Sequence, residues 1–167
     1  VRLWSLKDAA AAPRVIEGHA GPVNAVAFLP DGSGIVTGGY DGEVRTTFLA
    51  PGRAPLIRQL GTPVNALLVT AGGQVLAAGA DGRVLELDRT LATVRERSLD
   101  LGPLTTLALT RDETLLATAG MRTPVTLIER AGLTPRSEIL GPGLPVWSLA
   151  FSTDGTELFT GGADRAV

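Results

Sequence analysis

The chain has 167 residues, 44% hydrophobic and 19% charged, with 21 Gly, 11 Pro, no Cys and a formal net charge of −2. This length and apolar content suit one compact domain, and a nearly neutral chain without a basic stripe argues against nucleic-acid binding. The absence of Cys and the single His exclude disulfides, thiolate metal sites and multi-histidine metal sites. No apolar run approaches the ~20 residues of a membrane span. Only one of the 15 basic residues is Lys, which suggests a GC-rich bacterial source.

Two short markers recur along the chain in phase. The first is a turn dipeptide ending in Pro before an apolar segment, at intervals of 41, 40 and 42 residues: Pro22, Pro63, Pro103 and Pro145. The second marker is a four-residue segment whose last residue follows the proline by 18 or 19 positions: Gly38–Asp41, Ala78–Asp81, Ala119–Arg122 and Gly161–Asp164. Two independent markers that keep phase over four units indicate an internal repeat.

The first complete repeat predicts four short strands. Asn24–Leu29 is an apolar run that ends at a Pro-Asp-Gly-Ser turn, and Ile35–Thr37 is followed by an Asp-Gly hairpin signal. Val44–Leu49 and Leu56–Leu60 are the third and fourth strands. First strands such as Ala66–Val69 are almost continuously apolar, which indicates burial on both faces.

Four antiparallel strands in ~41 residues, stacked face to face, are typical of β-propeller blades. We therefore predict an all-β fold with a partial blade of third and fourth strands, three complete blades, and a partial blade of first and second strands. Their respective ranges are 1–16, 17–60, 61–100, 101–140 and 141–167. The interval that would close the chain on itself is 44 residues, so a closed four-bladed ring, with Thr156–Thr160 beside Val1–Trp4, is an alternative.

The repeats resemble those of the WD-repeat β-propellers over essentially the whole chain. The likeness rests on Gly18-His19 before a first strand, on the phrase Val23–Gly32, on Thr37–Asp41, and on Val1–Trp4. The resemblance implies four WD-type blades. Because rings of this family have about seven blades, it favours an arc of a larger ring over a closed ring of four.

The resemblance also implies a hydrogen-bonded network within a blade, formed here by His19, Thr37 and Asp41. The Gly-His pair occurs only once, and the signature Trp occurs only as Trp4, so the network in the first complete blade is incomplete. Its Trp position holds Thr47. Further structural roles at equivalent turns and strands are expected for Asp81, Thr160 and Asp164.

Little in the sequence suggests catalysis. His19 is expected to be structural rather than a base or a ligand, and Asp41, Asp81 and Asp164 fall one per blade rather than forming an acidic triad. Ser, Thr and the lone His offer no nucleophile–base arrangement, and no Gly-rich segment precedes a helix as a phosphate loop would. We expect no catalytic residue, no metal site and no cofactor in this chain.

A binding surface remains. One rim of a propeller channel consists of the starts of the first strands and of the turns between second and third strands. By phase, the residues expected to bind a partner on this rim are Trp147, Tyr40, Asn24, Asn65, Thr105, Met121 and Arg122. Trp147 and Tyr40 are two of the three Trp and Tyr residues in the chain, and such side chains are enriched at interface hot spots. In the alternative interpretation, Trp147 packs on a neighbouring blade and Tyr40 covers a loop.

The expected function is thus a non-catalytic scaffold that binds a protein or peptide, without nucleic-acid binding or membrane insertion. Exposed blade faces at the ends of an arc would also favour self-association. A second hypothesis is a sensory or redox-linked module, since the repeats resemble bacterial chains in which such a propeller lies beside a periplasmic c-type haem domain. That resemblance favours the periplasm over the cytoplasm. A third is an enzyme that uses the channel.

Overall fold

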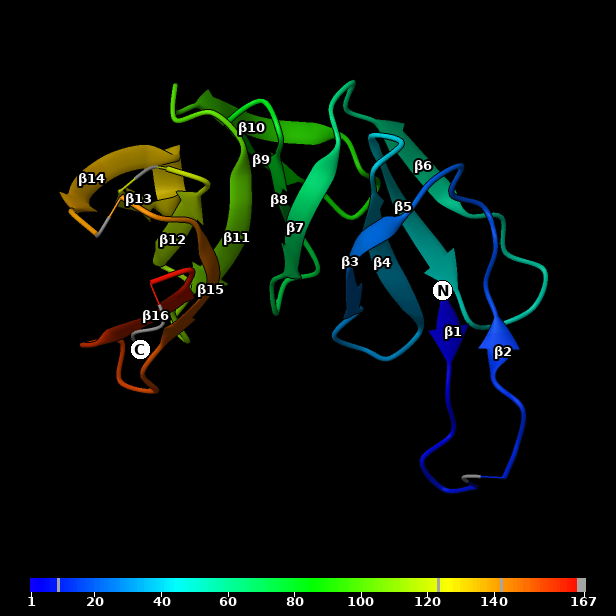
Figure 1. Cartoon of the computed structure of the whole chain (residues 1–167). Coiled ribbons are helices and arrows are strands. Elements are labelled where there is room, and N and C mark those ends of the chain that lie inside the picture. The colour runs from blue at the N-terminus through cyan, green and yellow to red at the C-terminus, as the bar shows by residue number, and fades with distance from the viewer. Residues whose placement is uncertain (9, 123, 142, 165–167) are drawn as a thin grey trace.

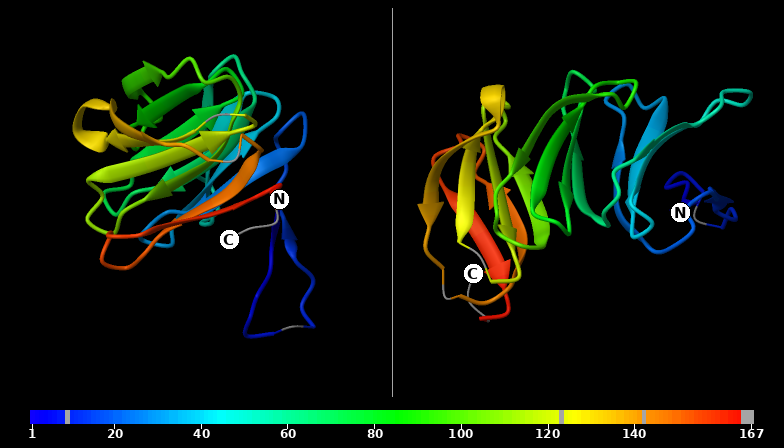
Figure 2. Two further views of the ribbon diagram at one scale, coloured as in Figure 1. Left: turned by 60° about the vertical axis from the view of Figure 1, so that its left-hand side comes forward. Right: turned by 90° about the horizontal axis from the view of Figure 1, so that it is seen from above.

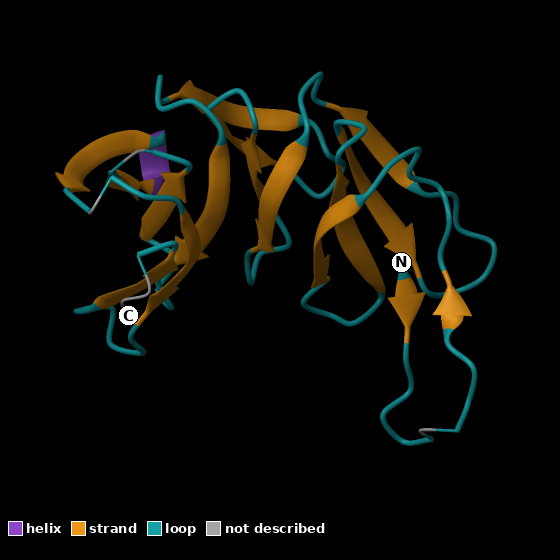
Figure 3. Ribbon diagram, viewed as in Figure 1, coloured by secondary structure: helices purple, strands orange, loops and turns teal. Residues whose placement is uncertain are grey.

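The computed structural model describes residues 1–8, 10–122, 124–141 and 143–164, and these form an all-β structure (Figures 1 and 3). Two strands form the first sheet: β1 (Arg2–Leu3) and β2 (Arg14–Val15). The second sheet comprises β3 (Val23–Phe28), β4 (Gly34–Gly39), β5 (Glu43–Phe48) and β6 (Leu56–Gln59). The third comprises β7 (Val64–Val69), β8 (Val75–Gly79), β9 (Arg83–Leu87) and β10 (Thr93–Ser98).

The fourth sheet comprises β11 (Leu104–Leu109), β12 (Leu115–Gly120), β13 (Val125–Glu129) and β14 (Thr134–Ile139), with the short 3-10 turn η1 (Arg130–Gly132) before its last strand. The fifth comprises β15 (Val146–Phe151) and β16 (Leu158–Gly162). In every sheet, strands that follow one another in the chain pair antiparallel. Among the described residues, no helix is long and apolar enough to cross a bilayer.

The turn chemistry explains why the strands lie where they do. The Asp-Gly turn between β4 and β5 has Gly42 at φ 79°, and the matching turn between β8 and β9 has Gly82 at φ 81°, a region that only Gly adopts readily. The second strand of the first repeat is longer than the predicted Ile35–Thr37, since it runs from Gly34 to Gly39. The boundaries of the five predicted units stay predictions, and the last unit extends over residues 142 and 165–167, outside the described residues.

The sheets stand side by side in a curved row, in which the first strands β3, β7, β11 and β15 are nearest neighbours (Figures 1 and 2). The sheet β1–β2 lies at one end of the row and β15–β16 at the other, and the two sheets do not pair. The arc is therefore open, as the family's ring size suggested, and the closed four-bladed ring is not formed. The buried clusters join only consecutive sheets, so no core links the two ends.

The core consists of three apolar clusters, each between two neighbouring complete or partial blades. The first joins Val36 and Val44 to the sheet β7–β10, the second joins Leu76 and Val84 to the sheet β11–β14, and the third joins Ala117 and its neighbours to β15. The middle strands β4 and β8 are buried along their whole length, as expected of strands between two packed faces.

The outer faces of the arc are less well covered. Val26 and Phe28 on β3 are 56% and 57% exposed, whereas Leu67, which occupies the place of Val26 on β7, is 7% exposed. Phe159 on β16, at the other end of the row, is 52% exposed. The end faces are therefore apolar and open, and self-association through them stays a prediction.

Candidate binding rim

The two sequence markers meet in the structure. In each unit, the residue after the second strand donates its backbone N–H to the carbonyl of the marker proline. The pairs are Tyr40–Pro22 at 2.8 Å, Ala80–Pro63 at 2.9 Å, Met121–Pro103 at 3.4 Å and Ala163–Pro145 at 2.9 Å. This repeated bond joins the turn between second and third strands to the start of the first strand. We call the edge formed by these four pairs the rim.

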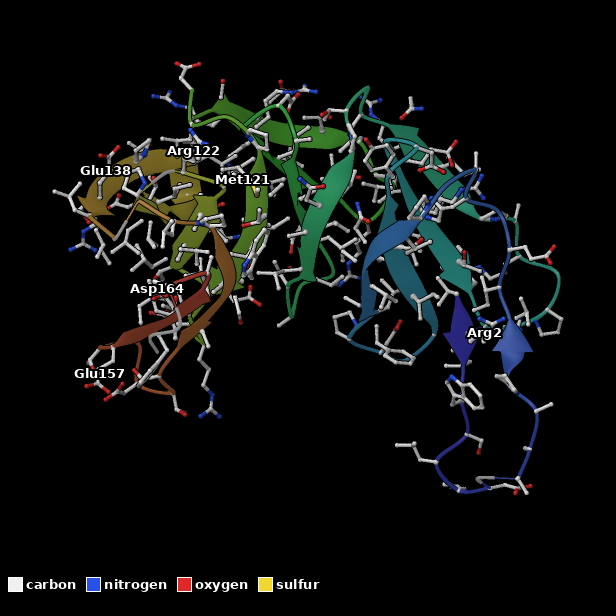
Figure 4. The ribbon with its side chains drawn as sticks, in the orientation of Figure 1. Arg2, Met121, Arg122, Glu138, Glu157 and Asp164 are labelled. Atoms are coloured by element: carbon white, nitrogen blue, oxygen red, sulfur yellow. The ribbon has the colours of Figure 1, made fainter. Side chains whose placement is uncertain are left out.

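The aromatic residues predicted for the rim are exposed on it. Tyr40 follows β4 and is 64% exposed, and Trp147 on β15 is 54% exposed. Met121 and Arg122 follow β12 and are also exposed, on the side of the arc away from Arg2 (Figure 4). Neither Tyr40 nor Trp147 is buried against a neighbouring sheet, so both remain available for contact.

Three other predicted rim residues tie the blades together. Asn24 donates from its side-chain amide to the carbonyl of Val64 at 3.0 Å, and Asn65 donates to that of Leu104 at 2.7 Å. In the third complete blade, the hydroxyl of Thr105 donates to the carbonyl of Val146. The position two residues after the first three marker prolines therefore bridges one first strand to the next. Binding of a partner by Asn24, Asn65 and Thr105 stays a prediction, and the structure gives these side chains a bridging role.

The same position in the last unit holds Trp147, and no further sheet follows β15–β16 among the described residues. Trp147 thus differs from its three equivalents in side-chain chemistry.

His19 makes the network that the resemblance implied. Its Nδ1 lies 3.0 Å from each carboxylate oxygen of Asp41, and its Nε2 lies 2.8 Å from the hydroxyl of Thr37. Because an ionised carboxylate only accepts, Nδ1 donates to Asp41, and in that tautomer Nε2 accepts a hydrogen bond from the Thr37 hydroxyl. The side chains of His19 and Asp41 are largely buried, so this triad fixes the rim turn to the second strand.

Asp41 is held ionised by its neighbours. Burial by itself raises the pKa of this carboxyl, but hydrogen bonds from His19 and from the backbone N–H groups of Glu43 and Ala20 outweigh it and lower the pKa below its ordinary value. The turn is thereby stabilised by the charged form of the carboxylate.

The second complete blade fills the same positions differently. Ala77 and Leu87 stand where Thr37 and Thr47 stand in the first, and both are fully buried in the first apolar cluster. The turn carboxylate, Asp81, pairs with Arg83 instead of a histidine. Apolar side chains thus replace the polar triad in the second complete blade, and the pairing register of its second and third strands is unchanged.

The third complete blade keeps only part of the triad. Thr118, the equivalent of Thr37, donates its hydroxyl to the carbonyl of Thr106 at 3.0 Å. Its cross-strand partner Thr126 is 2% exposed, and its hydroxyl has no hydrogen-bond partner among the described residues. Arg122 stands at the turn position that Asp41 occupies, so no carboxylate is supplied there.

Trp4 stands at the end of the third strand of its unit, and its structural role stays a prediction. It lies directly after β1 and is 59% exposed. In a WD-type blade its partner would be a hydroxyl on the second strand of its own sheet, and that sheet contains only β1 and β2. Thr160 pairs with Leu149 within the last sheet, and Asp164 follows β16 (Figure 4). Structural roles for Thr160 and Asp164 stay predictions.

The residues around His19 are poorly suited to bind a metal ion. His19, Asp41 and Glu43 bring ligand atoms within 4.8 Å of one another. Both ring nitrogens of His19 already have partners, and Glu43 accepts a hydrogen bond from the Nε of Arg45 at 2.6 Å. A guanidinium at this distance disfavours a second cation, so the cluster is structural.

An ionic cluster that the sequence pattern did not predict lies between the second and third complete blades. Glu86 on β9 is 3% exposed at its side chain and accepts from Arg95 at 2.5 Å and from Arg130 at 2.8 Å. Arg130 also donates to Glu113 at 2.9 Å, and Glu113 accepts the backbone N–H of Ala71. The sequence holds one signal for it, since Glu86 stands between the apolar residues Leu85 and Leu87.

By architecture the chain is an arc of a β-propeller, with three complete blades between two half-blades. Residues 12–46 and 134–167 match the family model described as "WD domain, G-beta repeat". Each match begins at the last strand of one unit and continues into the first strands of the next. These two segments are therefore identified as WD40 repeats, as the residue pattern indicated. The predicted bacterial source of the chain stays untested.

The similar proteins are longer than this chain. A guanine nucleotide-binding protein subunit beta of Oryza sativa subsp. indica is 34% identical over 113 residues, which are 62% of this chain and 29% of the relative. The subunit beta of Arabidopsis thaliana is 35% identical over 83 residues, 47% of this chain and 22% of the relative. Subunit I of human eukaryotic translation initiation factor 3 is 50% identical over 36 residues, 22% of this chain and 11% of the relative. The chain spans less than a third of the length of these relatives.

Proposed function

We propose that this arc is a non-catalytic scaffold that binds a protein or peptide partner along the rim, with Trp147 and Tyr40 as the main contacts. The observation that carries the proposal is the exposure of both rings on an edge that backbone hydrogen bonds make rigid. Rigid aromatic side chains provide contact area at a low entropic cost.

The similar proteins support a partner-binding role. They are named as subunits of a guanine nucleotide-binding protein and of a translation initiation factor, which makes them components of larger assemblies. WD40 repeats across residues 12–46 and 134–167 are consistent with the same kind of role here.

The chemistry of the described residues supports a non-catalytic role. Both ring nitrogens of His19 are engaged with Asp41 and Thr37, so the ring is not free to take a proton from a substrate. The carboxylate of Asp41 accepts backbone and His19 N–H groups, and that of Glu86 accepts two guanidinium groups. These groups stabilise the fold. No observation favours the haem-linked alternative, and we do not propose it.

The rim assignment is tested by partner capture followed by affinity measurement. The chain is immobilised, a partner retained from a lysate of the source organism is identified and purified, and its affinity for variants is measured by calorimetry. Trp147→Ala and Tyr40→Ala should each weaken binding about tenfold or more. Arg136→Glu, on the outer strand β14, is the control and should bind like the wild type. Unchanged binding by both aromatic variants together with loss in Arg136→Glu would place the partner on the outer edge.

A further inference from the structure

The edge opposite the rim carries pockets between the complete blades. Here the turns between first and second strands meet those between third and fourth strands. The pocket between the second and third complete blades has a volume of about 510 Å³, and the one between the first and second has about 580 Å³. Because the blades repeat, the two pockets can be compared residue by residue.

In the pocket between the second and third complete blades, an arginine is held by two carboxylates. Arg130 follows the third strand of its blade and donates to Glu86 of the preceding blade and to Glu113 of its own. Glu86 is paired a second time, by Arg95 across the strands β9 and β10. The charges of this pocket are therefore largely satisfied within the chain.

The pocket between the first and second complete blades has an equivalent arginine, Arg89, but no carboxylate at the positions equivalent to Glu86 and Glu113. Arg89 follows β9 as Arg130 follows β13. Thr46 stands where Glu86 stands one blade later, and Leu56, which pairs with Thr46, stands in place of Arg95. Gly73, at φ 81°, stands in place of Glu113, which has φ 60°.

Arg89 nonetheless lies over its pocket. Its Nε is 2.9 Å from where a Cβ on Gly73 would be, and it donates to the carbonyl of Gly72 at 2.6 Å. The described residues place no carboxylate in an ion pair with Arg89. The guanidinium is thus positioned by backbone, and the two acceptors that its equivalent uses are absent.

The remaining lining favours an acidic and apolar ligand. Arg53 lies over the ring of Phe48, with its guanidinium carbon 3.5 Å from the ring centroid, and Leu29 and Leu56 also line the pocket. One carboxylate, Asp31, also lines the pocket. It accepts the backbone N–H of Ser33 at 2.9 Å, and its pKa is lowered by the hydrogen bonds from Ser33 and, to a smaller extent, by the charge of Arg89. Two guanidinium groups against one carboxylate leave the pocket positively charged.

We infer that this pocket, which is separate from the rim, binds an acidic peptide segment of a partner protein. A carboxylate of the peptide would pair with Arg89 in the way that Glu86 pairs with Arg130. A neighbouring aliphatic side chain would cover the Phe48 and Leu56 surface. The inference stands without the rim assignment, because it rests on the opposite edge of the sheets.

The test uses a short fluorescein-labelled peptide in which aspartate and leucine alternate, with a lysine–leucine peptide as its counterpart, and fluorescence anisotropy on the full chain. The aspartate peptide should bind saturably and the lysine peptide should not. Arg89→Glu should weaken binding about ten- to hundredfold, since a charge-assisted hydrogen bond is lost and repulsion is added. Arg97→Glu makes the same charge change on the exposed strand β10, outside the pocket, and should bind like the wild type.

A second variant introduces a carboxylate into the pocket at the position equivalent to Glu86. Thr46→Glu places an acid where Glu86 stands one blade later, so it should pair with Arg89 and abolish peptide binding while the urea unfolding midpoint is kept. Adding Arg89→Glu to it should lower that midpoint, because the new acid would lose its partner. The proposal is overturned if the wild type shows no saturable binding at about 1 mM peptide, or if Arg97→Glu weakens binding as much as Arg89→Glu. Loss of binding in Trp147→Ala would instead place the peptide on the rim.

Discussion

The first and second complete blades have the same strand order and register type but are stabilised by different chemistry. The first holds its rim turn with the buried triad of His19, Asp41 and Thr37. The second fills the equivalent space with Ala77 and Leu87. The second blade also has a buried acid, Glu86, near the edge opposite the rim. There Glu86 pairs with Arg130 of the third blade. The difference shows that a blade needs these positions filled and paired, whereas the particular network is optional.

The two arrangements also act over different ranges. The triad lies within one blade and joins a turn to a strand, so it orders the local backbone. The cluster around Glu86 crosses from one blade to the next, so it sets how neighbouring blades align. Breaking the two separately should therefore give effects of different size.

Removal of Glu86 should have the largest effect. Glu86→Ala leaves Arg130, whose side chain is mostly buried, without its partner in the preceding blade, so we expect a loss of about 3 kcal/mol in the free energy of unfolding. Urea denaturation followed by circular dichroism measures it. Glu96→Ala removes an acid from an exposed pair with Arg83 and should cost at most about 1 kcal/mol. Equal losses in the two variants would mean that the cluster does not hold the blades together.

Loss of the triad should have an intermediate effect. His19→Ala removes hydrogen bonds to Asp41 and Thr37 and leaves two polar groups without that partner, so we expect a cost of about 2 kcal/mol. Leu60→Ala is the matched change in the second blade, because Leu60 precedes Pro63 by the same three residues as His19 precedes Pro22. A His19→Ala variant as stable as the wild type would show that the first blade does not need its triad.

The triad should also make stability depend on acid pH. The pKa of Asp41 is lowered in the folded state, so its contribution is complete above the unfolded-state pKa of about 3.9 and is lost as pH falls through the lower folded-state value. Thermal melts of Asp41→Asn should therefore show less destabilisation than the wild type as the pH falls from about 4 to 2. Asp88, whose pKa is lowered by Thr90, is present in both proteins and cancels in the difference. Parallel pH profiles would contradict the assignment.

The smallest expected effect is in the third complete blade, where one substitution should raise the free energy of unfolding instead of lowering it. The hydroxyl of Thr126 is buried without a partner, so Thr126→Val should raise the free energy of unfolding by about 1 kcal/mol. Thr118→Val, whose hydroxyl donates to Thr106, should lower it by a similar amount. Chemical denaturation of both variants separates the two cases, and a loss in Thr126→Val would show that its hydroxyl is satisfied.

The sequence was informative wherever a short-range rule decides the structure. The proline and Asp-Gly markers predict where the strands lie, and the resemblance carried by Gly18-His19 implied the contact of His19 with Asp41. It was uninformative about contacts between blades. Asn24 was assigned to partner binding because phase placed it on the rim, but the phase does not reveal that the carbonyl of Val64 lies 3.0 Å away.

By itself, the sequence determined the repeat, the all-β class and the residues of the rim, because turn chemistry and apolar alternation act over a few residues and recur every ~41. Only the tertiary structure decided that the ends stay apart and that Trp4 is exposed. It also decided that Glu86 pairs across a blade interface while Arg89 has no such acid. These outcomes depend on how one sheet packs on the next, which brings together residues about 40 positions apart that no local pattern relates.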